Sequence, residues 1–183
     1  MLTSHHISKL EITLLRHLLV SLCLLTPIEL AAQSGDPTVS FDDNDQAMNS
    51  AMSEAVRTFP VFLGNATDAN GASVPSAFVK VSFDVADGTE IIWVGPFVEQ
   101  GGGQFVGALA NRPNYMPGLN AGDTVEFTTD MVRDWAIQLP DGLLWGHYTT
   151  RQIAATLSTD QAAQIMAALS ETPVLMHGNR NAV

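Results

Sequence analysis

The stretch GDTVEFTTDMVRDWAIQLPDGLLWGHYTTRQI, residues 122–153, decides the fold of this chain, because strand alternation, a turn and a helix start follow one another in it without a gap. Val125 and Phe127 alternate with polar neighbours, and the same period of two runs from Trp135 to Leu139. Such alternation is typical of strands with one buried face. The stretch therefore predicts a β-rich corner that leads into a helix.

The second half of the stretch predicts how that helix begins. Residues 140–142 read Pro-Asp-Gly, a turn in which proline presets φ and glycine accepts a positive φ. Thr149 or Thr150 then caps a helix that begins near Arg151, since threonine hydroxyls accept hydrogen bonds from the first backbone N–H groups of a helix.

Arg151 is the polar residue to follow, because a cation in the first turn of a helix opposes the helix dipole unless something compensates it. The period of two places Asp134 on the face of its strand opposite Trp135. One interpretation pairs this carboxylate with Arg151 as a structural clamp. The other has Arg151, Tyr148 and the free N–H groups of the helix start bind a small anion. The sequence leaves both open.

The rest of the chain predicts a helix, a set of strands and a last helix. Apolar residues recur at three and four positions from Asp42 or Asp43 onward, which predicts an amphipathic helix ending before Pro60. Alternation predicts strands at 77–85, 89–98 and 105–109. We therefore expect a single α+β domain with an antiparallel, meander-like sheet of about five strands. The N-terminal helix and the C-terminal helices pack on that sheet.

The first residues have the order of a secretory signal peptide. Lys9 and Arg16 precede an apolar run over residues 18–25, and the small pair Ala31-Ala32 follows. The run is too short for the roughly 20 residues of a membrane-spanning helix. We expect cleavage near Ala32, a periplasmic or secreted protein, and no stable membrane span afterwards. The alternative is an uncleaved membrane anchor.

The expected domain organisation follows from these boundaries. Residues 1–32 form the signal peptide and residues 33–41 a flexible leader with Gly35 and Pro37. The α+β domain spans 42–170, and 171–183 is a loose tail.

Composition excludes several classes of function. The chain carries a formal charge of −11 with only eight Lys and Arg, so it lacks the basic patch that nucleic acid or anionic membrane binding needs. Cys23, the one cysteine, lies in the predicted signal, so neither a disulfide nor a thiolate metal site is expected. We expect no cofactor and no metal.

The tryptophans and histidines give no complete catalytic set. Trp93 and Trp135 lie on predicted strands, where core packing is the simpler interpretation over an exposed ligand surface; Trp145 is expected to be partly exposed. His147 and His177 are the two histidines after the signal, and neither a G-x-S-x-G nor an HExxH pattern is present.

An ordered series of short motifs resembles a known family. The series comprises Glu90–Val94 (EIIWV), Asn111, Gly122–Val125 (GDTV), Asp134-Trp135, Gly142, Gly146 and Tyr148–Arg151 (YTTR). It resembles the YegJ-like bacterial family catalogued as domain of unknown function 2314, over residues of about 42–157. A helix at 159–170 is expected to lie outside the shared part. The resemblance implies a single α+β domain and no particular reaction, since the family has no established activity.

Two functions remain as hypotheses. The preferred one is an exported, non-enzymatic domain that binds another protein or a small anionic ligand. The alternative is a small hydrolase-like enzyme at the Tyr148–Arg151 corner, with His147 as base, which requires three side chains to converge on one open pocket. The candidate ligand or structural cluster is Asp134, Trp135, His147, Tyr148, Thr149 and Arg151.

Overall fold

The structure is a computed structural model that describes residues 45–174. The predicted signal peptide (1–32) and leader (33–41) lie outside the described residues, as do residues 175–183 of the predicted tail. In chain order the elements are α2 (Gln46–Ala66), β1 (Ala77–Val85), β2 (Gly88–Gly101), β3 (Gln104–Leu109), β4 (Thr124–Thr128), the 3₁₀ turn η1 (Thr129–Met131), β5 (Val132–Gln138), β6 (Leu144–Gly146), α3 (Tyr148–Ala155) and α4 (Thr159–Ala168).

Helix α2 is longer than the sequence predicts. Asp45 caps it by accepting a hydrogen bond from the backbone nitrogen of Met48 at 3.0 Å. The predicted end before Pro60 is wrong, because the helix continues through this proline to Ala66. Proline removes one helical hydrogen bond, but Phe62, two residues further on, is fully buried. The burial of the second half of the helix outweighs the lost bond.

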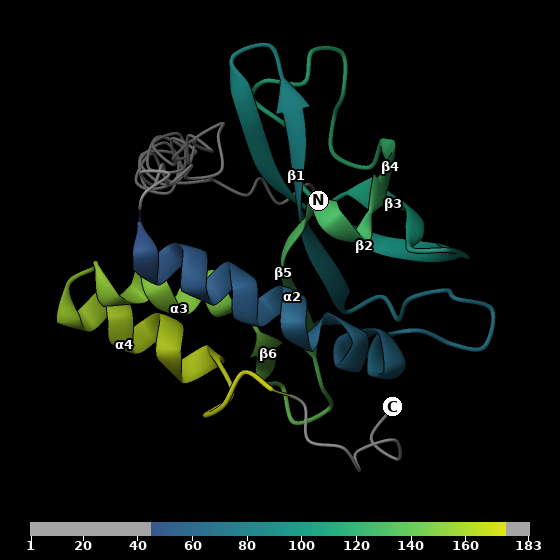
Figure 1. Ribbon diagram of the computed structural model, residues 1–183. Helices are drawn as coiled ribbons and strands as arrows, with labels where there is room; N and C mark the ends of the chain where they lie inside the picture. Colours follow the sequence, from purple (N-terminus) through teal and green to yellow (C-terminus); the bar gives the residue numbers. More distant parts are fainter. Residues whose placement is uncertain (1–44, 175–183) are drawn as a thin grey trace, which may run out of the picture. The chain divides into compact units, whose positions relative to one another are not determined.

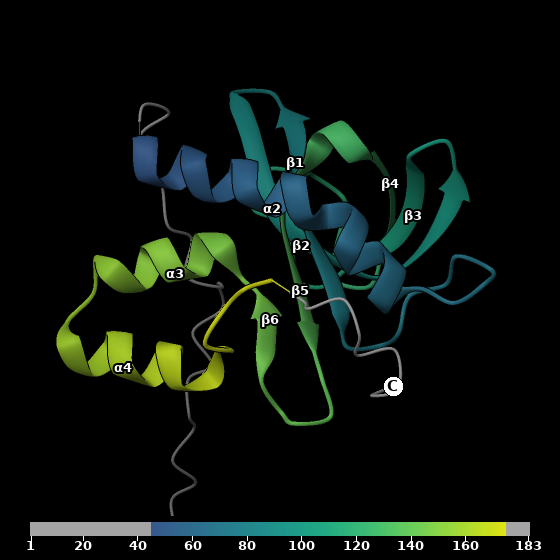
Figure 2. The same ribbon diagram turned by 60° about the horizontal axis from the view of Figure 1, so that its bottom comes forward.

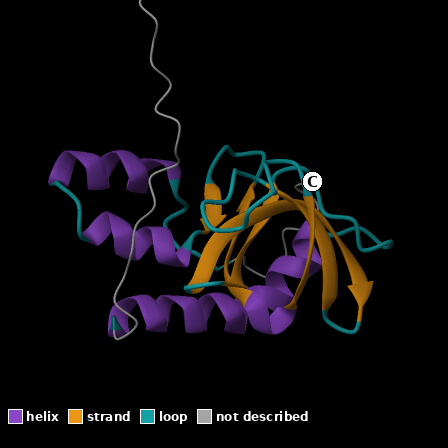
Figure 3. Ribbon diagram, turned by 90° about the horizontal axis from the view of Figure 1, so that it is seen from above, coloured by secondary structure: helices purple, strands orange, loops and turns teal. Residues whose placement is uncertain are grey.

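The six strands form one antiparallel sheet in the order β4-β3-β2-β1-β5-β6. The predicted α+β class is confirmed, with six strands rather than about five. The meander holds from β1 to β4, after which β5 returns to pair with β1 at the other side of the sheet. Only the three residues of η1 separate β4 from β5, and three residues span about 10 Å at most. The sheet must therefore curl strongly, as Figure 3 shows.

The core lies between the inner face of the curled sheet and α2. Phe62 of α2 stacks on Trp135 of β5 with ring centroids 5.0 Å apart, and Phe59 meets Phe105 edge-on at 5.9 Å. All four side chains are at most 1% exposed. Burying a large apolar side chain contributes about 1.5–3 kcal/mol, so these rings fix the sheet against α2.

Helices α3 and α4 complete the described part. Figures 1 and 2 show α3 beside the first half of α2, with α4 beyond α3. After α4 the chain stays packed for a few residues, because the backbone nitrogen of Gly146 donates to the carbonyl of Pro173 at 3.0 Å. None of the helices among residues 45–174 combines the length and apolar character that crossing a membrane requires.

Candidate functional site

Three neighbouring strands place a row of polar and aromatic residues on the outer face of the sheet. Lys80 of β1 is directly opposite Trp93 of β2 and, on its other side, opposite Asp134 of β5. Residues that oppose one another across strands share a face. The row therefore lies on the face away from Trp135, which is buried against α2.

Asp134 is fully buried and organises the start of α3. Its carboxylate accepts hydrogen bonds from the backbone nitrogens of Trp135 (2.8 Å), Tyr148 (3.1 Å) and Thr149 (2.8 Å), and from the Thr149 hydroxyl (2.6 Å). Burial raises the pKa of Asp134, while the bonds from Thr149 and the charge of Lys80 act against the rise. A carboxylate at a helix start also complements the helix dipole.

This arrangement corrects the predicted helix start. The helix begins at Tyr148 rather than near Arg151, and neither Thr149 nor Thr150 is its N-cap. His147 occupies the N-cap position without a side-chain capping bond. A capping carboxylate from β5 replaces the local hydroxyl that the sequence pattern favours.

Lys80 lies next to the buried Asp134–Thr149 pair. Its ammonium donates to the Thr149 hydroxyl oxygen at 3.0 Å and lies 5.2 Å from the centroid of the Trp93 ring, a cation–π distance. Burial lowers the pKa of Lys80, and Asp134 works in the opposite direction. The bonds form a chain from the Lys80 amine through the Thr149 hydroxyl to the Asp134 carboxylate.

His147 closes the other side of the row. Its backbone is left-handed, with φ of 53°, and its ring lies 5.3 Å from the Trp93 ring. Its Nδ1 is 3.1 Å from the hydroxyl oxygen of Thr150. Burial, then the charges of Lys80 and Arg151, lower the pKa of His147 to about 4, so the imidazole is neutral at physiological pH.

Gly146 lets this corner close onto β5. It has a φ of 79°, and a Cβ added there would collide with the carbonyl oxygen and the indole of Trp135. The next backbone nitrogen, of His147, donates to that same carbonyl at 2.9 Å. Only glycine permits this approach, which brings the start of α3 down onto Asp134.

Arg151 does not pair with Asp134. Its guanidinium donates to the carbonyl (3.0 Å) and hydroxyl (3.3 Å) of Ser170 and, more weakly, to the carbonyl of Gly146 (3.3 Å). Between residues 45 and 174 the one ion pair is Arg57 with Glu54. Arg151 therefore does not form the predicted clamp with Asp134. It holds the segment after α4 instead, through Ser170. The predicted anion site at the helix start is also absent, since Asp134 already occupies its N–H groups.

The hydrolase-like corner does not assemble either. The Tyr148 hydroxyl accepts a hydrogen bond from Thr58 of α2 at 2.9 Å, and Tyr148 is 7% exposed. Its side chain thus points into the core, whereas His147 faces Trp93 and Arg151 faces Ser170. The three side chains diverge instead of meeting in a pocket.

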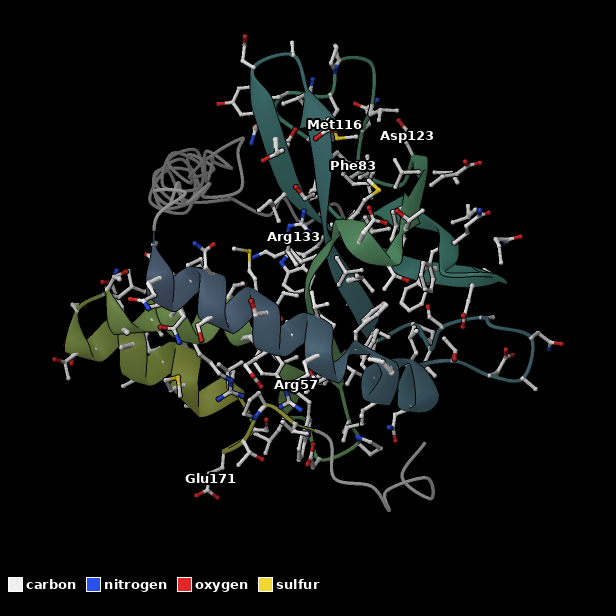
Figure 4. All side chains as sticks on the ribbon, in the orientation of Figure 1. Arg57, Phe83, Met116, Asp123, Arg133 and Glu171 are labelled. Carbon is white, nitrogen blue, oxygen red and sulfur yellow. The ribbon has the colours of Figure 1, made fainter. Side chains whose placement is uncertain are left out.

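An open groove of about 430 Å³ lies elsewhere, between the first half of α2 and the start of β5. It is lined by Asn49, Met52, Ser53, Val56, Val132 and Arg133. Figure 4 shows Arg133 and Arg57 projecting on opposite sides of α2. No group of three side chains able to hold a metal ion occurs within residues 45–174.

The tryptophans divide between two environments. Trp135 is a core residue as predicted, and its indole nitrogen donates to the Ala55 carbonyl and the Thr58 hydroxyl, both at 3.1 Å. The core prediction for Trp93 is wrong, because this half-buried ring lies on the outer face with Lys80. Trp145 is half-buried, and its indole nitrogen has no hydrogen-bond partner in the described part of the chain.

Sequence reasoning missed Lys80 as a site residue. One signal could have found it: the chain has two lysines, Lys9 in the predicted signal and Lys80 in the middle of a strand. Its alternation with buried valines shows only that it faces away from the core. The aromatic and histidine neighbours come from β2 and from the start of α3, which no local pattern connects with Lys80.

Fold and site together define an α+β domain whose curled sheet carries a lysine-centred row on its outer face. The chain belongs to the family described as "Uncharacterized protein conserved in bacteria (DUF2314)", whose model matches residues 45–170. The match includes α4, which the sequence analysis placed outside the shared part. No curated protein and no solved structure matches the chain.

Proposed function

We propose that this protein is an exported, non-enzymatic binding module that holds a small anionic ligand at Lys80, on the outer face of its sheet. The observation that carries the proposal is the state of the Lys80 amine. An ammonium has three donors, and one of them is used, on the Thr149 hydroxyl. Its other two N–H groups have no acceptor among the described residues.

An anionic ligand would be a better acceptor for the two remaining N–H groups of Lys80 than the side chains that surround them. Asp134 is the nearest carboxylate, but its oxygens already accept four hydrogen bonds from Trp135, Tyr148 and Thr149. A charge-assisted bond to a ligand would satisfy a half-buried ammonium. The Trp93 ring offers an adjacent apolar wall. The neutral His147 adds no competing negative charge.

The affinity for the anion should decrease as the pH rises. Burial holds the pKa of Lys80 below its ordinary value, and an anion binds the charged form. Binding therefore weakens as pH rises through the pKa of Lys80. Asp134 and His147 also face the amine; His147 is neutral above pH of about 4 and does not change over that range.

The test is calorimetric titration of the full chain with benzoate, acetate and inorganic phosphate. Lys80→Met keeps the aliphatic stem and removes the charge, so we expect it to weaken binding at least about tenfold, or roughly 1.4 kcal/mol. Arg57→Gln removes a charge from an exposed pair and should leave binding unchanged. The proposal is overturned if no anion binds, or if Lys80→Met binds as tightly as the wild type.

Export rests on the order of residues 1–32, namely two basic residues, a short apolar run and a small-residue exit. Fractionation of the bacterial source with mass analysis of the purified chain tests it. We expect a periplasmic or secreted protein that begins near Gln33. A cytoplasmic protein that retains residues 1–32 contradicts this part of the proposal and leaves the ligand site to be judged by titration.

A further inference from the structure

The Lys80 amine has an environment that suits covalent chemistry as well as charge. Lys80 is the single lysine of residues 33–183, and it stands in the middle of a strand rather than on a loop. Its nitrogen lies between the face of Trp93 and the hydroxyl of Thr149. The Lys80 residue is half-buried, so part of its surface is open to solvent.

The hydrogen-bond chain leaves the lone pair of the neutral amine free. The Thr149 hydroxyl donates its one proton to Asp134 at 2.6 Å, so it can only accept from Lys80. A neutral amine therefore gives one N–H to Thr149 and keeps its lone pair unengaged. The contact fixes the nitrogen without blocking it.

Burial also makes the neutral amine more populated at a given pH than in a free lysine. Burial disfavours the charged ammonium and lowers the pKa of Lys80, whereas the Trp93 ring, at a cation–π distance, favours it. Two titratable groups lie near the amine. His147 is neutral, and the charge of Asp134, on the far side of the Thr149 hydroxyl, raises the pKa of Lys80.

We propose that Lys80 is a carbonyl-reactive amine that forms an imine with small aldehydes at the outer face of the sheet. The nitrogen lone pair attacks the carbonyl carbon and forms a C–N bond, while the π pair of the carbonyl moves to its oxygen. A proton passes from nitrogen to that oxygen to give a carbinolamine. The hydroxyl then leaves with the remaining nitrogen proton as water, and the C=N bond forms. No oxidant or reductant is needed.

This activity is independent of the anion site proposed above, because the two use opposite protonation states of one amine. Anion affinity falls as pH rises through the pKa of Lys80, whereas the rate of imine formation rises. An aldehyde without charge, such as benzaldehyde, probes the second property alone. Failure of the anion titration therefore leaves imine formation intact, and the reverse also holds.

The experiment treats the full chain with benzaldehyde and cyanoborohydride, which traps an imine as a stable amine, and follows Lys80 by peptide mass spectrometry. The reference is Nα-acetyl-lysine amide under the same conditions. We expect Lys80 to react faster near neutral pH, with its half-maximal rate at lower pH than the reference. Lys80→Arg should abolish the adduct at that position.

Unfolding in urea gives the matched control. The rate at Lys80 should fall to that of the reference amine once Trp93 and Thr149 no longer surround it. Two outcomes overturn the inference: a folded-state rate no greater than that of the reference, or a rate that unfolding leaves unchanged.

Discussion

The carboxylate of Asp134 lies 2.6 Å from the hydroxyl oxygen of Thr149, and this contact joins β5 to the start of α3. Both residues are buried, with Asp134 0% and Thr149 3% exposed. Through Lys80 the same hydroxyl also connects β1 to the helix. The candidate site therefore depends on the buried hydrogen bond between Asp134 and Thr149, in addition to apolar packing.

Asp134→Asn should destabilise the fold by about 2–4 kcal/mol, because the amide removes the charge and turns an NH₂ group toward backbone N–H donors. Urea unfolding measures the change. Asp84→Asn, at an exposed position on β1, is the control and should stay within about 0.5 kcal/mol. An equal effect of the two substitutions would show that the buried carboxylate is not a structural requirement.

The free energy of unfolding should fall in mild acid because of the imidazole of His147. Its pKa is about 4 in the folded state against an ordinary 6.5, so the unfolded chain takes up a proton first as the pH is lowered. The contribution is fully present above pH 6.5 and is lost as the pH falls towards 4. At about 1.36 kcal/mol per pH unit, the contribution of His147 to the free energy of unfolding is at most about 3–4 kcal/mol.

His147→Asn isolates this effect, because asparagine tolerates the left-handed backbone and does not titrate. Urea unfolding of both proteins between about pH 7 and pH 4 gives the comparison. The wild type should lose more stability than the variant over this range. Parallel pH profiles would mean that His147 protonates equally well in both states.

Local rules predicted the strands well and the site only in part. The β1–β2 hairpin turns at Ala86-Asp87-Gly88, where the Asp-Gly pair is typical of a turn, because turn chemistry acts over a few residues. The return of β5 to β1 depends on the curl of the whole sheet, which no local pattern encodes. The start of α3 was predicted wrongly for the same reason. Capping rules consider residues within three or four positions, whereas Asp134 lies 15 positions before Thr149, whose backbone nitrogen it accepts from.

Gly146→Ala should be the most damaging glycine substitution at this corner. The added Cβ meets both a left-handed backbone and the Trp135 carbonyl, so we expect a loss of about 3 kcal/mol or more. Gly142→Ala has a similar φ of 82° but open space around it, and should cost only about 1 kcal/mol. The difference between the two unfolding free energies measures the collision. Equal losses would place the whole cost in the backbone conformation.

Arg151→Met should loosen α4. The guanidinium bonds to Ser170 hold the chain after this helix, and their loss leaves the Ser170 carbonyl without that donor. We expect a destabilisation of about 1–2 kcal/mol and faster hydrogen exchange over residues 159–170. Arg57→Met, at the exposed pair with Glu54, should leave exchange in α4 unchanged. Unaltered exchange in Arg151→Met would show that apolar contacts alone hold the helix.

Pro60 tests whether the core or the helix backbone sets the path of α2. The residue is exposed within the helix, and it cannot donate the hydrogen bond that would reach Val56. If straight helical geometry suits the core, Pro60→Ala restores that bond and stabilises the protein by about 1–3 kcal/mol. Ser53→Ala, exposed on the same helix, controls for helix propensity at about 0.5 kcal/mol. A loss of stability in Pro60→Ala would instead mean that the stacking of Phe62 on Trp135 requires the bend that proline imposes.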